Sequence, residues 1–373
     1  MYIDKIKKKV RTILKNINEL LFLICDSFLF LFLKILPLKN KKNIEKVCVR
    51  LDALGDAIIF INNINANNKD KTLYIISNLQ EQLFKELKNV ENYFVIDRLK
   101  FKINIFYRFK ILVQIYGIQC NEIINPIFSK EILLEDTIVR FIQSRKKIGL
   151  LGNLENSSLF FNHIGNKFYH ELIDVNHNQN MHDFHLNYEI LKITNPSEQL
   201  YRNPINFDSF FLKKDKNNHN YSNCIIIHCG SGRKKRNLPE IYFHKIIEHI
   251  LLEHNTKIIL TGHSSYEKKV CDRIEKKFGN HILNLHGKTS IKDIYNIANS
   301  CKRIITNDTF MAHVGYMLDC KTIIFKKHTN NYNRFLPYPN SFPSKNIKKV
   351  FLLNKNLYSN FNDVLSSVNF LLE

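Results

Sequence analysis

The sequence predicts an α/β protein made of two Rossmann-like domains that face each other across a cleft. Short β-branched strands alternate with helical segments in two separate series along the chain, and this alternation is typical of parallel sheets covered by helices on both faces. A polar stretch with two prolines, residues 195–222, separates the two series and suits an interdomain linker. The length of 373 residues fits two domains of ordinary size.

The composition excludes several classes of protein. Hydrophobic residues make up 45% of the chain, so it can bury cores and is not a disordered protein. The eight cysteines form no Cys-x-x-Cys pair, which argues against a zinc site or a disulfide framework and favours a reducing compartment. The net charge of +21 favours an anionic partner such as nucleic acid, acidic lipid or a phosphorylated sugar. Biased codon usage, indicated by the many Asn and Ile residues, is a second explanation of the charge, so the charge alone does not identify a partner.

Residues 1–42 form a basic and apolar segment that differs from the rest of the chain. The apolar run at residues 20–36 has cationic residues on both sides and is interrupted by Asp26, Ser27 and Lys34. These charges disfavour a membrane-spanning helix, and we find no small-residue cleavage site of a secretory signal in the segment. We expect either a basic amphipathic helix on an anionic membrane surface or a helix that packs on the protein's own core.

The first strand–helix series predicts an amino-terminal domain over residues 43–200. Strands are expected at 47–51, 73–77, 93–96, 123–125 and 147–151, and helices at 57–64, 79–87 and 183–193. After the first strand, Gly55 permits a tight turn and Asp56 lies near the start of the next helix. A carboxylate at this place is either a helix N-cap or, if it faces a cleft, a general base.

The second series predicts a carboxyl-terminal domain over residues 201–350. Strands are expected at 224–228, 257–261, 282–285, 303–306 and 321–325, and helices at 239–254, 266–278, 290–300 and 311–317. A terminal helix within residues 351–373 is expected to pack back on the first domain. Because ligands of such folds bind at the carboxyl ends of the strands, the loops that follow the strands are the candidate sites.

Two loops of the second domain carry groups suited to an anionic ligand. Residues 228–236 combine a Gly/Ser turn with four consecutive cations before a helix, which suits a diphosphate. The spacing is not that of a P-loop, and a solvated surface turn is the alternative. Asp308, Thr309 and His313 follow another strand, where they either cap the next helix or bind phosphate, ribose or sugar groups. Residues 261–263 end a strand at the same rim.

Six segments within residues 46–340 resemble, in order, the motifs of one enzyme family. They are 49–56 with the Gly-Asp turn, 147–149, 226–239 with its His-x-Gly-Ser loop, 260–262 together with Glu267, 285–290, and the Asp-Thr-x-x-x-His run in 307–313. Together they resemble glycosyltransferase family 9, the lipopolysaccharide heptosyltransferase family. The resemblance implies a GT-B fold, with an amino-terminal acceptor domain and a carboxyl-terminal donor domain.

The resemblance also implies an activity. It implies transfer of a heptose or a similar sugar from a nucleotide-sugar donor, ADP-heptose for example, to a lipopolysaccharide-core or related surface-glycan acceptor. The transfer is expected to invert the sugar carbon and to need neither a metal nor another cofactor. Asp56 takes the role of catalytic base. The expected donor-binding residues, which include groups that would stabilise the leaving diphosphate, are Ser231, Lys235, Arg236, Gly262, Glu267, Asp308, Thr309 and His313.

The chain departs from the family pattern at four positions. Cys229 replaces a Pro, Arg236 a Lys, Leu238 a Trp, and Phe310 the Gly that follows Asp-Thr. These departures keep two alternatives open, namely a GT-B transferase for a capsule or glycoprotein acceptor and an inactive homologue.

A basic nucleic-acid-binding protein is a more remote alternative, because the charge is not accompanied by a recognised nucleic-acid-binding motif. The expected partners are a nucleotide sugar, a lipid-linked or oligosaccharide acceptor and an anionic membrane surface, without nucleic acid. The expected location is the cytoplasmic face of the inner membrane.

Overall fold

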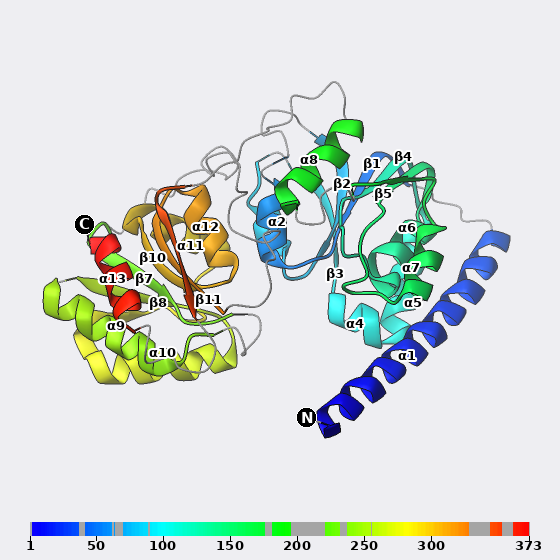
Figure 1. The fold of residues 1–373 in the computed structure, drawn as a ribbon. Coiled ribbons are helices and arrows are strands. Elements are labelled where there is room, and N and C mark those ends of the chain that lie inside the picture. The colour runs from blue at the N-terminus through cyan, green and yellow to red at the C-terminus, as the bar shows by residue number, and fades with distance from the viewer. Residues whose placement is uncertain are drawn as a thin grey trace.

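A computed structural model describes most of the chain and contains one long helix followed by two α/β lobes (Figure 1). The described residues are 2–36, 42–61, 63, 70–88, 90–175, 181–194, 221–231, 237–254, 256–327, 344–352 and 361–372. Most of the predicted linker, and the run of four cations at 233–236, lie outside them.

The first lobe is built around a parallel six-stranded sheet. Its strands, in spatial order, are β3 (Val90–Ile96), β2 (Asp70–Ser77), β1 (Lys42–Arg50), β4 (Ile118–Asn125), β5 (Gln143–Leu150) and β6 (Glu171–Ile173). Its helices are α2 (Leu54–Ile61), α3 (Glu81–Lys85), α4 (Arg98–Ile103), α5 (Ile105–Tyr116), the π-helical turn η1 (Ile132–Asp136), α6 (Thr137–Phe141), α7 (Leu159–Asn166) and α8 (Asp183–Thr194). All five strands predicted here are present, while β6 and the helices between β3 and β6 were not predicted.

The second lobe repeats the same strand order. Its strands, in spatial order, are β12 (Ile347–Leu352), β11 (Lys321–Lys327), β10 (Arg303–Asn307), β7 (Cys224–His228), β8 (Lys257–Thr261) and β9 (Ile282–Asn284). Its helices are α9 (Glu240–Glu253), α10 (Ser265–Phe278), the 3-10 turn η5 (Gly279–His281), α11 (Ile291–Cys301), α12 (Phe310–Met317) and α13 (Phe361–Leu372). The predicted α/β architecture of two parallel sheets is therefore confirmed.

The terminal helix α13 packs on the second lobe, so the expectation that it returns to the first domain is wrong. Val364, Val368 and Leu371 are fully buried in the same core as strand residues of β7 and β8. Their spacing places them on one face of the helix, and this face lies against α9, β11 and β12. In Figure 1 the helix lies at the far side of the second lobe from the first.

The long helix α1 (Tyr2–Ile35) lies along the first lobe beside α5 and η1, on the side away from the second lobe (Figure 1). Leu23 and Leu33 on its inner face are buried. Asp26, also on this face, is fully buried and accepts three hydrogen bonds from the guanidinium of Arg108 in α5, at 2.6, 2.8 and 3.1 Å. The expectation of a helix packed on the protein's own core is therefore confirmed for this face.

Breaking the ion pair that holds α1 should destabilise the first lobe. In Asp26→Ala the Arg108 guanidinium stays buried without its counter-charge, and such losses cost about 3–5 kcal/mol. We expect a fall of this size in the free energy of unfolding, measured by urea denaturation. The double variant Asp26→Leu/Arg108→Met removes both charges and should be less destabilised than Asp26→Ala. Equal stability of Asp26→Ala and the parent protein would show that the pair does not anchor the helix.

Candidate active site

The candidate site lies where the two lobes meet. In each sheet the strand order reverses between two neighbouring strands, β1 and β4 in the first lobe and β7 and β10 in the second. Ligands of open α/β sheets bind at this point, outside the carboxyl ends of the strands. The loops after β1, β7, β8 and β10 carry the predicted site residues, so topology brings them to the expected edges.

Helix α2 of the first lobe and helix α12 of the second lobe contact each other through their first turns. A Cβ atom placed on Gly55 would lie 3.1 Å from Cδ2 of His313 and 3.7 Å from the Cα atom of Phe310. Gly55 does not have a positive φ, so the predicted reason for this glycine, a tight turn, is wrong. Glycine suits this position because the backbone of one lobe approaches the side chain of the other closely enough that a Cβ atom would press on the imidazole.

Asp56, the predicted base, lies in the first turn of α2 directly after this contact. Its Oδ2 accepts a hydrogen bond from the backbone N–H of Ala53, the residue before the helix, at 3.2 Å. Asp56 therefore stabilises the helix start from the third helical position and is not the N-cap that the capping alternative expected. Burial, and then the neighbouring carboxyl groups of Asp52 and Asp183, raise the pKa of Asp56 to about 8, against the opposing effect of Arg50. A carboxyl group with such a pKa is a stronger base than an ordinary aspartate.

Arg50, which the sequence analysis did not single out, organises these carboxyl groups. Its buried guanidinium forms an ion pair with Asp52 at 2.8 Å, donates to the carbonyl oxygen of Asp56 at 3.0 Å, and donates to Oδ1 of Asn187 at 2.9 Å. Asp183 and Asn187 come from α8, more than 120 residues later in the chain. In the sequence, Arg50 is a charged residue at the end of an apolar strand and two positions before Asp52, and this pattern could have revealed its role.

A second charged cluster of the first lobe also went unpredicted. Arg98 pairs with Glu131 at 2.8 Å, and Lys102 pairs with the same carboxylate. Arg98 lies near enough to Asp52 to lower its pKa, although burial raises that pKa overall. Arg98, Lys102 and Glu131 therefore lie beside the group of charged residues formed by Arg50, Asp52 and Asp56.

On the second lobe, His228 ends β7 and is buried beside Thr261 at the end of β8. Its Nδ1 lies 3.0 Å from Oγ1 of Thr261, and burial lowers the pKa of His228 to about 4. The imidazole is therefore neutral near pH 7. The ring of Phe310 packs edge-on against it, with centroids 5.4 Å apart. Phe310, which replaces the family's glycine, is thus accommodated by a contact within the lobe.

Asn307, the last residue of β10, holds the loop that follows β7. Its amide group donates to the carbonyl oxygens of Cys229 and Gly230 at 3.0 and 3.2 Å, and its Oδ1 accepts from the backbone N–H of Leu238 at 2.8 Å. Ser231, a predicted donor-binding residue, lies between these anchor points and donates to Asn237. The loop ends are fixed from β10, while Lys235 and Arg236 lie outside the described residues.

Glu267 lies between two of the predicted loops. Its Oε2 accepts the backbone N–H groups of His263 and Ser264 at 2.6 and 2.8 Å, in a capping box that starts α10. A Cβ atom on Gly230 would lie 1.7 Å from its Oε1, and one on Gly262 would lie 2.9 Å from its Oε2. The two glycines therefore make room for this buried carboxylate, whose Oε1 lies against Gly230.

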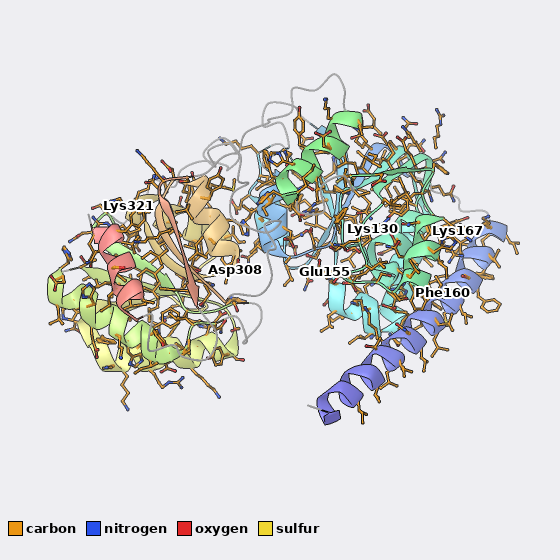
Figure 2. The ribbon with its side chains drawn as sticks, viewed as in Figure 1. Lys130, Glu155, Phe160, Lys167, Asp308 and Lys321 are labelled. Atoms are coloured by element: carbon orange, nitrogen blue, oxygen red, sulfur yellow. The ribbon has the colours of Figure 1, made fainter. Side chains whose placement is uncertain are left out.

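The predicted Asp308, Thr309 and His313 surround the start of α12. Thr309 is the N-cap, because its Oγ1 accepts the backbone N–H of Met311 at 3.2 Å. Asp308 keeps part of its surface exposed, and Figure 2 shows it on the side of the second lobe nearest α2. His313 is buried against Gly55. Of the three residues, His313 contacts the Gly-Asp segment of the first lobe. Within the described residues no group of three His, Cys, Asp or Glu side chains is arranged to hold a metal ion.

The raised pKa of Asp56 predicts how a neutral substitute alters stability. A carboxyl group whose folded-state pKa lies above its unfolded value of 3.8 destabilises the fold increasingly as pH rises between the two values. The unfolding temperature of Asp56→Asn should therefore exceed that of the parent protein by an amount that grows from about pH 5 to pH 8 and then levels off. Glu253→Gln, an exposed change on α9, should show no such trend. A constant difference at all pH values would mean that Asp56 titrates normally.

Comparison with known proteins identifies the family. A model of glycosyltransferase family 9 (heptosyltransferase) matches residues 137–356, more than half of the chain. No curated protein sequence matches significantly.

Similar solved structures extend over nearly the whole fold. The heptosyltransferase WaaC of E. coli, solved with ADP, has a TM-score of 0.69 at 14% identity, covering 87% of this chain and 99% of that one. ADP-heptose lps heptosyltransferase II of E. coli has a TM-score of 0.60 at 12% identity, covering 88% and 98%. A family 9 protein of Veillonella parvula has a TM-score of 0.61 at 14% identity, covering 86% and 89%. With its two facing parallel sheets arranged as in WaaC, this chain has a GT-B fold and belongs to glycosyltransferase family 9.

Proposed function

We propose that this protein is an inverting, metal-independent transferase that moves a heptose or a similar sugar from a nucleotide-sugar donor to a lipopolysaccharide-core or related surface-glycan acceptor. The contact between Gly55 and His313 is the observation that carries the proposal. It brings the candidate base of the first lobe next to the helix start that holds three predicted donor-binding residues.

The donor side suits a nucleoside diphosphate. The N-terminus of α12 and the start of the loop held by Asn307 lie at the same edge of the sheet, and helix N-termini bind phosphate groups. A neutral His228 lies in the wall of this region without adding charge. The solved structures of WaaC with ADP and with ADP-2-deoxy-2-fluoro heptose are relatives in fold that bind such ligands, which supports an ADP-sugar as the donor here.

The proposed inversion is the outcome of a single displacement that uses groups of both lobes. In a single displacement the acceptor oxygen attacks the sugar carbon from the side opposite the leaving diphosphate. Asp56 would take the proton of the acceptor hydroxyl while the bond between the sugar carbon and the diphosphate oxygen breaks. The amides near Ser231, with the cations of the 233–236 run, would stabilise the charge that develops on the diphosphate.

Replacing the base tests the chemical step separately from donor binding. Asp56→Asn and Asp56→Ala should lower transfer by about 10²- to 10⁴-fold or more, because an unassisted hydroxyl is a poor nucleophile. Donor binding, measured as thermal stabilisation by ADP-heptose, should stay within about twofold of the parent protein in Kd, since Asp56 belongs to the acceptor lobe. Glu253→Gln is the matched control with unchanged activity. Full transfer by Asp56→Ala would remove Asp56 from the mechanism.

The pKa of Asp56 predicts a pH dependence of the reaction. The base acts when ionised, so kcat/KM should rise with pH and level off above about 8. Asp52→Asn removes a negative charge that raises the pKa of Asp56 and releases Arg50 toward it, so the rising limb should move to lower pH. If kcat/KM of Asp52→Asn rises over the same pH range as that of the parent protein, a group other than Asp56 controls the pH dependence.

A panel of nucleotide sugars tests the donor class. ADP-heptose should raise the unfolding temperature more than UDP- or GDP-sugars do, and it should be consumed only when an acceptor glycan or water accepts the sugar. If a different nucleotide sugar stabilises the protein most, the protein would still be proposed as a transferase, with that sugar as its donor. Absence of stabilisation and of turnover with every donor would favour an inactive homologue.

A further inference from the structure

The outward face of α1 is an apolar surface that no described part of the protein covers. Large apolar side chains lie exposed along the helix at intervals of three and four residues, which places them on one face. They are Ile6, Val10, Ile13, Leu14, Ile17, Leu20, Leu21, Ile24, Phe28, Leu31, Phe32 and Ile35. The face runs for roughly 45 Å at 1.5 Å per residue. Isolated exposed apolar residues are normal, but a continuous stripe of this length marks a binding surface.

This stripe lies opposite the buried face of the same helix. The buried residues Glu19, Leu23, Asp26 and Leu33 recur at similar spacing but are offset by about half a turn from the exposed set. Helix α1 therefore has two apolar faces, one docked on the first lobe and one outward. We call the outward set, together with Leu159 and Phe160 of α7, the outer α1 surface. Figure 2 shows Phe160 beside α1, and Phe161 next to it packs in one cluster with Leu23.

We propose that the outer α1 surface binds an anionic lipid membrane, with α1 lying parallel to the membrane plane and still docked on the first lobe. Charge favours this occupant. Residues 2–36 contain seven cationic side chains and only three acidic ones, and two of those three, Glu19 and Asp26, are buried against the first lobe. Anionic head groups supply the missing negative charge, and apolar side chains enter the boundary between head groups and acyl chains.

The same charges argue against a second copy of the chain as the occupant. Two parallel α1 helices would bring their basic residues 5–15 together. Two antiparallel helices would place those residues against the other end of the face, which carries Lys34 and no exposed acidic group within residues 27–36. Neither pairing neutralises the cations.

A membrane-spanning arrangement conflicts with how the helix is held. By length and composition, Thr12–Ile35 could cross a membrane. Insertion would, however, break the hydrogen bonds between Asp26 and Arg108, leaving one charge in hydrocarbon and the other buried alone. It would also break the bond from Lys15 Nζ to the carbonyl oxygen of Asn156 at 2.8 Å. The helix is therefore built to lie on a surface while remaining part of the lobe.

Membrane binding through this face would bring the acceptor lobe close to lipid. Glu19 on the inner face of α1 lies near Glu131 and Lys102, whose charges affect its pKa. Arg98 continues this cluster to Asp52 beside the candidate base. Membrane binding itself does not rest on the proposed transfer reaction, and its test uses no catalysis.

The test is co-sedimentation of the full-length protein with vesicles. Vesicles with about 30% phosphatidylglycerol in phosphatidylcholine should bind the protein at least about tenfold more strongly than pure phosphatidylcholine, and high salt should reduce this difference. The double variant Phe28→Glu/Phe32→Glu alters side chains that are 70% and 59% exposed, so it should fold normally and lose at least about tenfold in binding. Leu252→Glu, at an 84% exposed position on α9 of the other lobe, is the matched control and should bind as the parent does.

Three outcomes would overturn the proposal. Equal loss of binding in Leu252→Glu and in the double variant would show that general charge, not the outer α1 surface, binds the vesicles. A parent protein that ignores vesicles but forms a dimer in sedimentation velocity, which the double variant abolishes, would assign the face to a second copy. Parent protein that stays in cell membranes after alkaline carbonate washing would show that α1 spans the bilayer. Thermal unfolding of each variant confirms that the fold is retained.

Discussion

The candidate site depends on the close approach of two helix starts that belong to different lobes. Gly55 of α2 and His313 of α12 approach so closely that a single added Cβ atom would lie 3.1 Å from the imidazole. Each helix begins directly after a strand at the point where its sheet reverses order. The contact thus joins the two places at which an open α/β sheet binds its ligand.

Asp56, the candidate base, lies in surroundings that cost stability when it is ionised. It accepts a hydrogen bond at the start of α2, yet it lies close to Asp52 and Asp183, and burial raises its pKa to about 8. A fold optimised for stability alone would replace one of these carboxyl groups. Arg50 offsets part of their repulsion from a position where it also fixes the backbone of the turn. Such a cluster in a cleft between lobes is typical of a functional site.

Helix α1 shows that a helix can belong to the fold and to a surface at once. Its inner face is tied to α5 by a fully buried ion pair, and its outer face remains apolar over its whole length. The structure confirms that one face of α1 packs on the core, as one of the two alternatives from the sequence expected. Membrane binding through the opposite face remains our proposal.

The sequence by itself determined the two parallel sheets, their strands, and the family motifs, because β-branched runs and glycine-containing turns are local signals. It also singled out Asp56, Glu267, Asp308, Thr309 and His313, whose roles in catalysis and donor binding remain predictions. Tertiary structure alone decided that α13 covers the second lobe, that Gly55 serves a contact between lobes, and that Arg50, Asp183, Asn187 and Asn307 organise the site. The roles of Arg50, Asn187 and Asn307 depend on hydrogen bonds between residues up to 137 positions apart, and those of Gly55 and α13 depend on close packing between distant segments. Packing and burial set such pairings, and no local pattern in the chain records them.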